Sequence, residues 1–195
     1  MIDFANLFWW LVVIFGYLLA IFLIVKTYVF AFSLFRDAPY VPYHTHSLKY
    51  AIDLLELNKN SKFIDIGSGD GVVVFDAANM TEGIARKYSG IEISKWLVFW
   101  SKFKTIFQKN RSKISFIQGD IFKYQNFGQY NRVFLYLTSN LASQIVLILL
   151  KELPKGSIIV SGDFDFNQEV HKKIKVEKII KEEGRKQYRF FKIKV

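Results

Sequence analysis

Residues 65–71 read Asp-Ile-Gly-Ser-Gly-Asp-Gly, and this stretch decides the fold of the 195-residue chain. The run Lys62–Ile64 before it is typical of a short buried strand, and the apolar segment 71–81 after it is typical of a helix. Glycines let the chain turn sharply between strand and helix, and they let backbone amides come close to a ligand. The stretch therefore predicts a strand–turn–helix unit of a parallel sheet, with a ligand at the turn.

The rest of the domain alternates between short apolar runs and longer amphipathic segments. Strands that alternate with helices predict an α/β fold with a doubly wound, mostly parallel, Rossmann-like sheet of seven strands. The predicted helices are Ser47–Leu57, 71–81, Trp96–Gln108 and Ala142–Leu153. The predicted strands are 62–67, 90–93, 114–118, 132–137 and 156–162, followed by a C-terminal β-hairpin of Val176–Ile180 and Tyr188–Val195.

The spacing of the glycines is G-x-G-x-G, which separates this loop from the dinucleotide fingerprint G-x-G-x-x-G. The fingerprint needs a small residue at position 72, which here is Val72. An acid, Asp65, lies two residues before the first glycine. A carboxylate there would repel a pyrophosphate, whereas it would attract a ligand that carries positive charge. The loop therefore favours a cationic ligand over a dinucleotide.

Two further acids follow the next two predicted strands. Glu92 lies 21 residues after Gly71, where a carboxylate can accept hydrogen bonds from both hydroxyls of a ribose. Asp120 follows the third strand, where it can accept from an adenine amino group, with Ile121 or Phe122 against the ring. Each acid alone could be an ordinary strand-end or capping residue. Three acids in register on successive strand ends indicate a binding site for an adenosine-containing ligand with a cationic end.

These motifs resemble the cofactor motifs of class I S-adenosylmethionine-dependent methyltransferases. The chain is more closely similar to membrane-anchored protein-lysine methyltransferases, a family that includes the mitochondrial enzymes acting on the adenine nucleotide translocase and on the c-ring protein of ATP synthase. The residues that carry the closer likeness are Pro39-Tyr40-Val41-Pro42 after an apolar N-terminal helix, the glycine loop, and Trp96-Leu97-Val98 with Ser101 in the following helix.

The resemblance implies that S-adenosylmethionine is the cofactor. The residues that match cofactor-binding positions are Asp65, Gly67, Ser68, Gly69, Gly71, Glu92, Asp120 and Ile121. It also implies a methyltransferase, tethered to the membrane, that N-methylates a lysine of a membrane or membrane-proximal protein. Two alternatives stay open: a methyltransferase for a lipid, quinone or other small hydrophobic acceptor, and a non-catalytic adenosylmethionine-binding membrane protein. The bilayer anchor argues against nucleic acid as the acceptor.

The acceptor side of the site is less clearly marked in the sequence. The fourth strand ends in Leu137-Thr138-Ser139-Asn140, which holds neither a catalytic acid nor an Asn-Pro-Pro-Tyr motif. A lysine acceptor must lose a proton before it attacks a methyl group, and an apolar slot beside a cation favours the neutral amine. We take Tyr40, Tyr43 and Tyr136 as candidates for an aromatic slot of this kind. Packing in the linker and the sheet core explains the same residues equally well.

The first residues form the most apolar part of the chain. Residues 4–25 carry no charge and are apolar on every face, and at about 1.5 Å per residue they span roughly 33 Å, enough for a bilayer core of about 30 Å. The start is acidic at Asp3 and the exit is aromatic, unlike a cleaved signal peptide. Residues 1–36 are therefore predicted to be a single-pass anchor, 37–46 a proline-containing linker, and 47–195 the methyltransferase domain.

The charge distribution predicts the orientation and a second membrane contact. Lys26, Arg36 and a basic domain follow the apolar segment, which places the catalytic domain in the cytoplasm by the positive-inside rule. Residues 171–195 hold ten Lys or Arg and three Glu, a net charge of +7. The C-terminal hairpin is therefore predicted to contact anionic lipid or an acidic partner, although a solvated strand face is an equal alternative.

Cysteine and histidine usage narrows the chemistry. The chain has no cysteine, which excludes a disulfide framework, thiolate zinc sites and a cysteine nucleophile. His44, His46 and His171 are not accompanied by a cluster of acids, so no metal site is predicted. The four Trp and twenty Phe are interpreted as membrane and core residues rather than as a platform for nucleic-acid bases.

Overall fold

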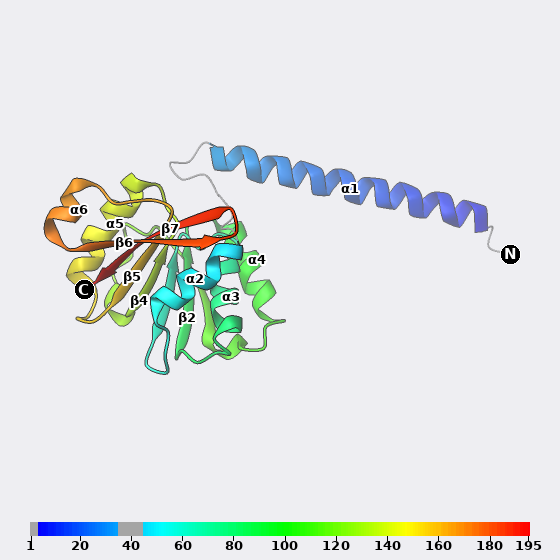
Figure 1. Ribbon diagram of the computed structural model, residues 1–195. Helices are drawn as coiled ribbons and strands as arrows, with labels where there is room; N and C mark the ends of the chain where they lie inside the picture. The colour runs from blue at the N-terminus through cyan, green and yellow to red at the C-terminus, as the bar shows by residue number, and fades with distance from the viewer. Residues whose placement is uncertain (1–3, 35–44) are drawn as a thin grey trace. The chain divides into compact units, whose positions relative to one another are not determined.

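The computed structural model describes residues 4–34 and 45–195 (Figure 1). The chain divides between Val41 and Pro42 into two compact units. The first unit contains the helix α1 (Phe4–Leu34), and the second contains the sheet and the remaining helices. Each unit is described below by itself.

Helix α1 has the length and composition of a membrane span. Its segment Phe8–Tyr28 is 21 residues long, and none of it is buried within the protein. The large apolar side chains along it, among them Trp9, Trp10 and Phe15, are exposed. A helix that is apolar on every face has no polar side to present to water, which is the pattern of a membrane span. That α1 crosses a bilayer stays a prediction.

The second unit is built on one seven-stranded sheet. The strand order is β3-β2-β1-β4-β5-β7-β6, in which β1 to β5 run parallel and β7 is antiparallel to both β5 and β6. The strands are β1 (Lys62–Ile66), β2 (Lys87–Glu92), β3 (Ile114–Gln118), β4 (Arg132–Leu135), β5 (Ile158–Gly162), β6 (Val176–Glu183) and β7 (Lys186–Lys194). The prediction of a doubly wound α/β fold with a C-terminal hairpin is therefore confirmed.

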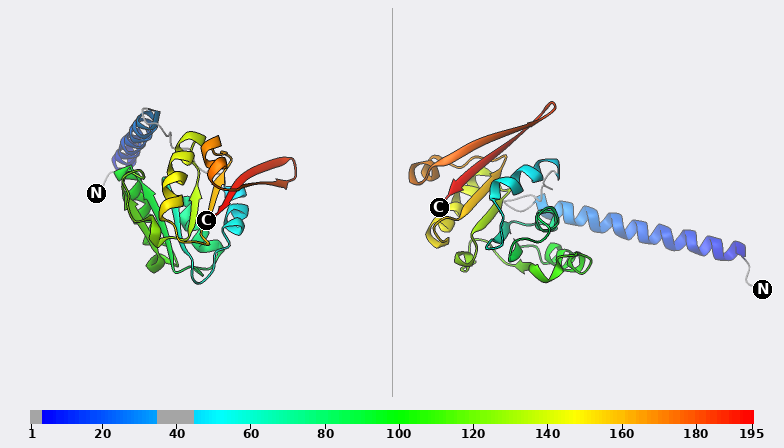
Figure 2. Two further views of the ribbon diagram at one scale, coloured as in Figure 1. Left: turned by 90° about the vertical axis from the view of Figure 1, so that its left-hand side faces the viewer. Right: turned by 60° about the horizontal axis from the view of Figure 1, so that its bottom comes forward.

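Helices cover both faces of this sheet, so its central strands are buried on both sides (Figures 1 and 2). The helices are α2 (Thr45–Leu55), α3 (Val72–Met80), α4 (Lys95–Thr105), α5 (Ser139–Glu152) and α6 (Gln168–Lys173). Buried side chains of α2, α3 and α4 belong to one apolar cluster, and those of α5 and α6 belong to the other. Alternate residues of β1 divide between them, since Phe63 joins the first cluster and Ile64 the second.

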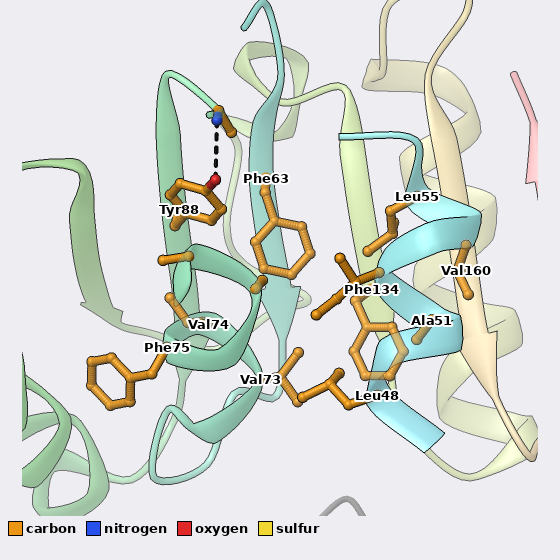
Figure 3. Packing of buried hydrophobic residues seen from close by; sticks show 14 of the residues in the cluster. Leu48, Ala51, Leu55, Phe63, Val73, Val74, Phe75, Tyr88, Phe134 and Val160 are labelled. Carbon is orange, nitrogen blue, oxygen red and sulfur yellow. Dashed lines mark hydrogen bonds between the residues drawn. The ribbon is translucent and has the colours of Figure 1, made fainter. Parts of the chain in front are cut away.

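Figure 3 shows the first cluster, in which Leu48, Ala51 and Leu55 of α2 pack toward Phe63 of β1 and Phe134 of β4. These α2 residues are spaced by three and four positions, which places them on one side of the helix. Tyr88 is also fully buried, and its hydroxyl accepts a hydrogen bond from the Ala85 amide at 3.0 Å. This packing fixes α2 and α3 against β1, whose end carries the glycine loop.

The last strand is held in place by an ion pair with the end of α2. The side chain of Lys192 on β7 is 7% exposed, and its Nζ lies 2.6 Å from Oε1 of Glu56. The hydrogen bond from Lys192 keeps the pKa of the Glu56 carboxyl below its usual value. Lys194 lies 3.4 Å from the same oxygen, and Lys173 pairs with Glu169 at 2.8 Å. Three of the ten basic residues of the tail are therefore paired with acids that lie outside it.

The structure differs from the sequence-based expectations at several boundaries. Helix α2 begins and ends two residues earlier than predicted, and α5 begins three residues earlier. Helix α6 is absent from the prediction, because a six-residue helix has too few turns to show a periodic pattern. The interpretation of the aromatic residues as membrane and core residues is wrong for α4. Trp96 is 53% exposed and Phe99 is 59% exposed.

Candidate functional site

The glycine loop leaves β1 in a conformation that only glycine adopts easily. Gly67, Gly69 and Gly71 all have positive φ, at 80°, 53° and 85°. The amides of Gly67 and Ser68 both donate to the carbonyl of Ile91 on β2, at 2.9 and 3.0 Å. The loop is thus fastened to the neighbouring strand, and its glycines serve the turn itself.

Close packing is a second reason for glycine in this region. A Cβ added at Gly71 would lie 2.6 Å from Cζ of Phe116, and one added at Gly90 would lie 2.5 Å from the hydroxyl of Ser68. Real Cβ atoms do not approach other atoms so closely, so either substitution would displace a neighbour. The Ser68 hydroxyl is itself buried and has no hydrogen-bond partner among the described residues.

Glu92 lies at the end of β2 and is bonded to the loop. Its Oε2 accepts a hydrogen bond from the Gly69 amide at 3.1 Å, and its Oε1 accepts from the Ser94 amide at 2.8 Å. Both oxygens are therefore oriented by backbone donors, and each retains acceptor capacity. Ser94 is also the N-cap of α4, so Glu92 joins the glycine loop to the start of that helix.

Asp65 is a buried carboxyl group without a partner. It is 3% exposed, and it has no hydrogen bond or ion pair within the part of the chain that the structure describes. Burial raises the pKa of Asp65 to about 8, and the nearby charges of Glu92 and Asp70 add to this effect. A carboxyl group in this state gains a favourable charge partner if a cation binds beside it.

The end of β3 is joined to the same edge of the sheet. The Gly119 amide donates to the carbonyl of Glu92 at 3.0 Å. Asp120 is partly exposed, and its Oδ1 accepts a hydrogen bond from the Phe122 amide at 3.0 Å. Ile121 packs against the second apolar cluster. The predicted cofactor residues on β1, β2 and β3 are thus brought to adjacent strand ends.

Ser101, one of the residues that carry the family likeness, has a structural role at the loop. It is fully buried on α4, and its hydroxyl donates to the carbonyl of Leu97 at 2.9 Å and approaches that of Gly69 at 3.5 Å. On the other side of the loop, Lys104 of α4 pairs with Asp70 at 3.0 Å. Helix α4 therefore holds the glycine loop through two side chains.

Of the predicted acceptor residues, the structure describes Tyr136 alone, because Tyr40 and Tyr43 lie outside the described residues. Tyr136 directly follows β4, and its ring lies 5.5 Å from that of Phe164. Burial raises the pKa of the Tyr136 phenol, and charge and hydrogen bonding from Asp163 raise it further. The phenol therefore stays protonated at neutral pH.

Sequence reasoning missed Asp163. This residue directly follows β5 and has a positive φ of 59°. Its amide donates to the carbonyl of Arg189 on β7, at 2.8 Å. Its position directly after an apolar strand was the available signal, the same one that identified Asp65 and Glu92. Since β4 and β5 follow β1 in the sheet, Tyr136 and Asp163 lie at the same edge as the glycine loop.

The residues present fit S-adenosylmethionine. The unpartnered buried carboxyl of Asp65 suits a cationic amino group, and the Glu92 carboxylate suits ribose hydroxyls. The closely packed glycine turn leaves room for a ligand only on its open side. Within the described ranges, no group of three or more potential metal ligands is present.

The comparisons with known proteins agree with this geometry. The family model for the ANTKMT methyltransferase domain matches residues 65–173. The chain is 30% identical over 128 residues to a lysine N-methyltransferase of Xenopus laevis that is named for the C protein of ATP synthase, covering 66% of this chain and 54% of that protein. The human protein of the same name is 28% identical over 128 residues, with 66% and 52% covered. The chain thus spans about half the length of these relatives.

A solved structure shares the fold. The RNA methyltransferase from Salinibacter ruber, crystallised with S-adenosyl-L-homocysteine, is 25% identical to this chain with a TM-score of 0.66. The alignment covers 78% of this chain and 92% of that one. The match to the family model includes the glycine loop, Glu92 and Asp120, so the likeness that the sequence predicted is confirmed. The chain belongs to the family of ANTKMT methyltransferase domains.

Proposed function

We propose that the protein is a membrane-tethered S-adenosylmethionine-dependent methyltransferase that N-methylates a lysine side chain of a membrane or membrane-proximal protein. The observation that carries the proposal is the buried, unpartnered carboxyl of Asp65 beside the glycine loop and Glu92, in a chain that belongs to a methyltransferase family. The relatives named as lysine N-methyltransferases support the choice of acceptor.

S-adenosylmethionine is the methyl donor, as the sequence predicts, and when bound it supplies a methyl group on a positively charged sulfur. Asp65 would hold its amino group, and Glu92 would accept hydrogen bonds from its ribose. Asp120 and Ile121 would lie at its adenine. These residues belong to three adjacent strands of one sheet, so their task is to fix the cofactor in a single orientation.

The acceptor is expected at the ends of β4 and β5. A lysine amine has a pKa of about 10.4 in water, so only roughly 0.04% of it is neutral at pH 7. Asp163 can hydrogen-bond the amine and accept its proton, while the protonated Tyr136 and the Phe164 ring provide an aromatic wall. Tyr40 and Tyr43 stay candidates for the same wall.

The tether is the candidate span Phe8–Tyr28 of α1. Residues 1–36 would form a single-pass anchor, with the linker 37–46 and the catalytic domain 47–195 on the cytoplasmic side. The basic β6–β7 hairpin stays a candidate for contact with anionic lipid. Four lysines of the tail, Lys172, Lys175, Lys178 and Lys181, have no acidic partner among the described residues.

The experiment is methyl transfer from radiolabelled S-adenosylmethionine into membranes, with the labelled material separated into protein, lipid and RNA. Label in protein as N-methyl-lysine is expected, and Asp163→Asn should reduce it without loss of cofactor binding. Label confined to lipid would support the small-hydrophobic-acceptor alternative. Label in RNA would contradict the choice of acceptor, and cofactor binding without any transfer would support the non-catalytic alternative.

A further inference from the structure

Helix α4 and the turn after it present large aromatic side chains to the outside of the domain. Trp96, Phe99, Trp100, Phe103 and Phe107 follow one another at intervals of three, one, three and four residues, and all are exposed. We refer to these five residues as the aromatic stripe. The rings of Trp96 and Phe99 stack at 5.8 Å, and those of Trp100 and Phe103 stack at 5.6 Å.

This pattern is the reverse of an ordinary surface helix. Only Val98 and Ser101 of α4 are buried, and they face the sheet and the glycine loop. The outward side of a soluble helix normally carries charged and polar residues, whereas here it carries the aromatic residues. A contiguous exposed apolar surface of this kind marks a contact with a protein or a membrane.

The charges around the stripe are all of one sign. Residues 93–119 hold six Lys or Arg and no Asp or Glu. Lys95 and Lys102 flank the stripe and line a shallow hollow of about 250 Å³ together with Val98, Phe99 and Gln118. A hollow with two lysines at an aromatic surface suits an anionic headgroup, while the aromatic rings suit the boundary between headgroups and acyl chains.

We propose that the outer side of α4 lies in the headgroup region of an anionic bilayer, with the aromatic stripe inserted and Lys95 and Lys102 at lipid phosphates. The proposal rests on the anchor of the proposed function, because ten residues, 35–44, join α1 to α2 and span at most about 36 Å. The domain of an anchored chain therefore cannot leave the neighbourhood of the bilayer. A protein partner at the stripe is the alternative occupant, but the uniform positive charge favours lipid.

The position of α4 gives this contact a functional consequence. The helix begins at Lys95, three residues after Glu92, and its Ser101 approaches the glycine loop. The cofactor edge would thus lie close to the membrane surface. The β6–β7 hairpin belongs to the other end of the sheet, as the strand order and Figure 2 show, so the bilayer contact of α4 is separate from any contact of the hairpin.

The chain allows a direct test, because its four tryptophans are Trp9, Trp10, Trp96 and Trp100. In the full-length double variant Trp9→Phe/Trp10→Phe, all tryptophan fluorescence comes from α4. The protein is reconstituted into vesicles of phosphatidylcholine and phosphatidylglycerol, with the acyl chains of the phosphatidylcholine either brominated or not. We expect blue-shifted emission and strong quenching in the brominated vesicles, and weaker quenching when phosphatidylglycerol is left out.

A matched control reports on the opposite end of the sheet. It replaces all four tryptophans with Phe and introduces Ile180→Trp on β6, where the native side chain is 49% exposed. Quenching at α4 that exceeds quenching at position 180 supports the proposal. Unquenched Trp96 and Trp100 would overturn it, and so would emission that changes with protein density rather than with bromination, because that result indicates a protein contact.

The failure of this proposal can be distinguished from the failure of the proposed function. Binding of S-adenosylhomocysteine and methyl transfer are measured on the same reconstituted variants. Intact binding and transfer with unquenched α4 would contradict the membrane contact alone. Recovery of the variant in the soluble fraction would instead contradict the anchor of the proposed function.

Discussion

The amide of Gly69 donates a hydrogen bond of 3.1 Å to Oε2 of Glu92, so the glycine loop of β1 and the acid of β2 form one bonded unit. The second oxygen of Glu92 is bonded to the Ser94 amide at 2.8 Å. The carboxylate therefore organises the backbone on both sides of the site in addition to facing a ligand. Its substitution is expected to affect binding and stability together.

Glu92→Gln should weaken binding of S-adenosylhomocysteine by about 1–3 kcal/mol, the range for hydrogen bonds to a charged group. The amide NH₂ of glutamine would also face one of the two backbone donors, which should lower the melting temperature. Isothermal titration calorimetry and thermal unfolding measure the two effects. NAD should not compete with the ligand, and binding of NAD in place of S-adenosylhomocysteine would contradict the assignment of the site.

Asp65→Asn should separate binding from stability. The variant loses the charge partner of the ligand's amino group, a charge-assisted interaction worth about 1.5–3 kcal/mol, so affinity should fall roughly 10- to 150-fold. The unliganded variant should be at least as stable as the wild type at pH 9, because no buried charge is left without a partner. Wild-type affinity in calorimetry would refute the role of Asp65.

The raised pKa of Asp65 predicts how stability depends on pH. The unfolded carboxyl titrates near pH 3.9, whereas burial raises the folded value to about 8. Between these values the folded chain holds a proton that the unfolded chain has released, so the free energy of unfolding falls as pH rises from about 4 to about 8. Denaturation of the unliganded protein across this window should show the decline, and Asp65→Asn should flatten it. An equal slope in both proteins would show that other groups cause it.

Gly71→Ala can be compared with a matched control in the same chain. Gly71 and Gly156 have nearly equal positive φ values, 85° and 82°, so alanine is strained by a similar amount at both. A Cβ at Gly71 meets Phe116 at 2.6 Å, whereas nothing lies within 4 Å of one at Gly156. Gly156→Ala should cost about 1 kcal/mol, and Gly71→Ala should cost more and weaken cofactor binding. Denaturant unfolding of both variants measures the difference, and equal losses would exclude a packing effect.

Asp163→Asn should reduce methyl transfer by about 10²-fold or more, in the range for loss of a general base, while affinity for S-adenosylhomocysteine stays at the wild-type value. The loss should be smaller at high pH, where more of the lysine is already neutral. Tyr136→Phe is the companion variant, because it keeps the ring and removes the hydroxyl. Calorimetry and a transfer assay across pH separate the two roles, and an unchanged rate in Asp163→Asn would remove Asp163 from the acceptor site.

Deleting residues 1–30 should release the protein from membranes, whereas high salt should not release the full-length chain. Burial of an apolar span is insensitive to ionic screening, unlike attraction between surface charges. Fractionation after a salt wash and after the deletion measures both effects. Intact protein in the salt wash would show that α1 does not span.

The cofactor side of the site could be predicted because local sequence determines it. A glycine loop after an apolar strand and acids at the next two strand ends are read in chain order, and parallel strands bring their ends to one edge. Asp163 could not be singled out in this way, since its pairing with Tyr136 depends on the adjacency of β4 and β5. The ion pair between Lys192 and Glu56 joins residues 136 positions apart, and no local pattern announces it.

The exposed stripe of α4 was missed for a different reason. Periodicity identifies an aromatic helix, but it does not show which side faces the sheet. Val98 and Ser101 are smaller than the aromatic residues around them, so composition suggested the opposite orientation. Only the packing of α4 against the glycine loop determines which side points outward.

The insertion of β7 between β5 and β6 has a consequence for the order of folding during synthesis. The ribosome delivers β6 before β7, but β6 pairs with β7 alone and cannot join the sheet until β7 has emerged. Until that moment β5 is an unpaired edge of an otherwise complete parallel sheet, and such an edge is prone to pair with other chains. The nascent protein is therefore most vulnerable to aggregation in the interval between translation of Gly162 and of Lys194.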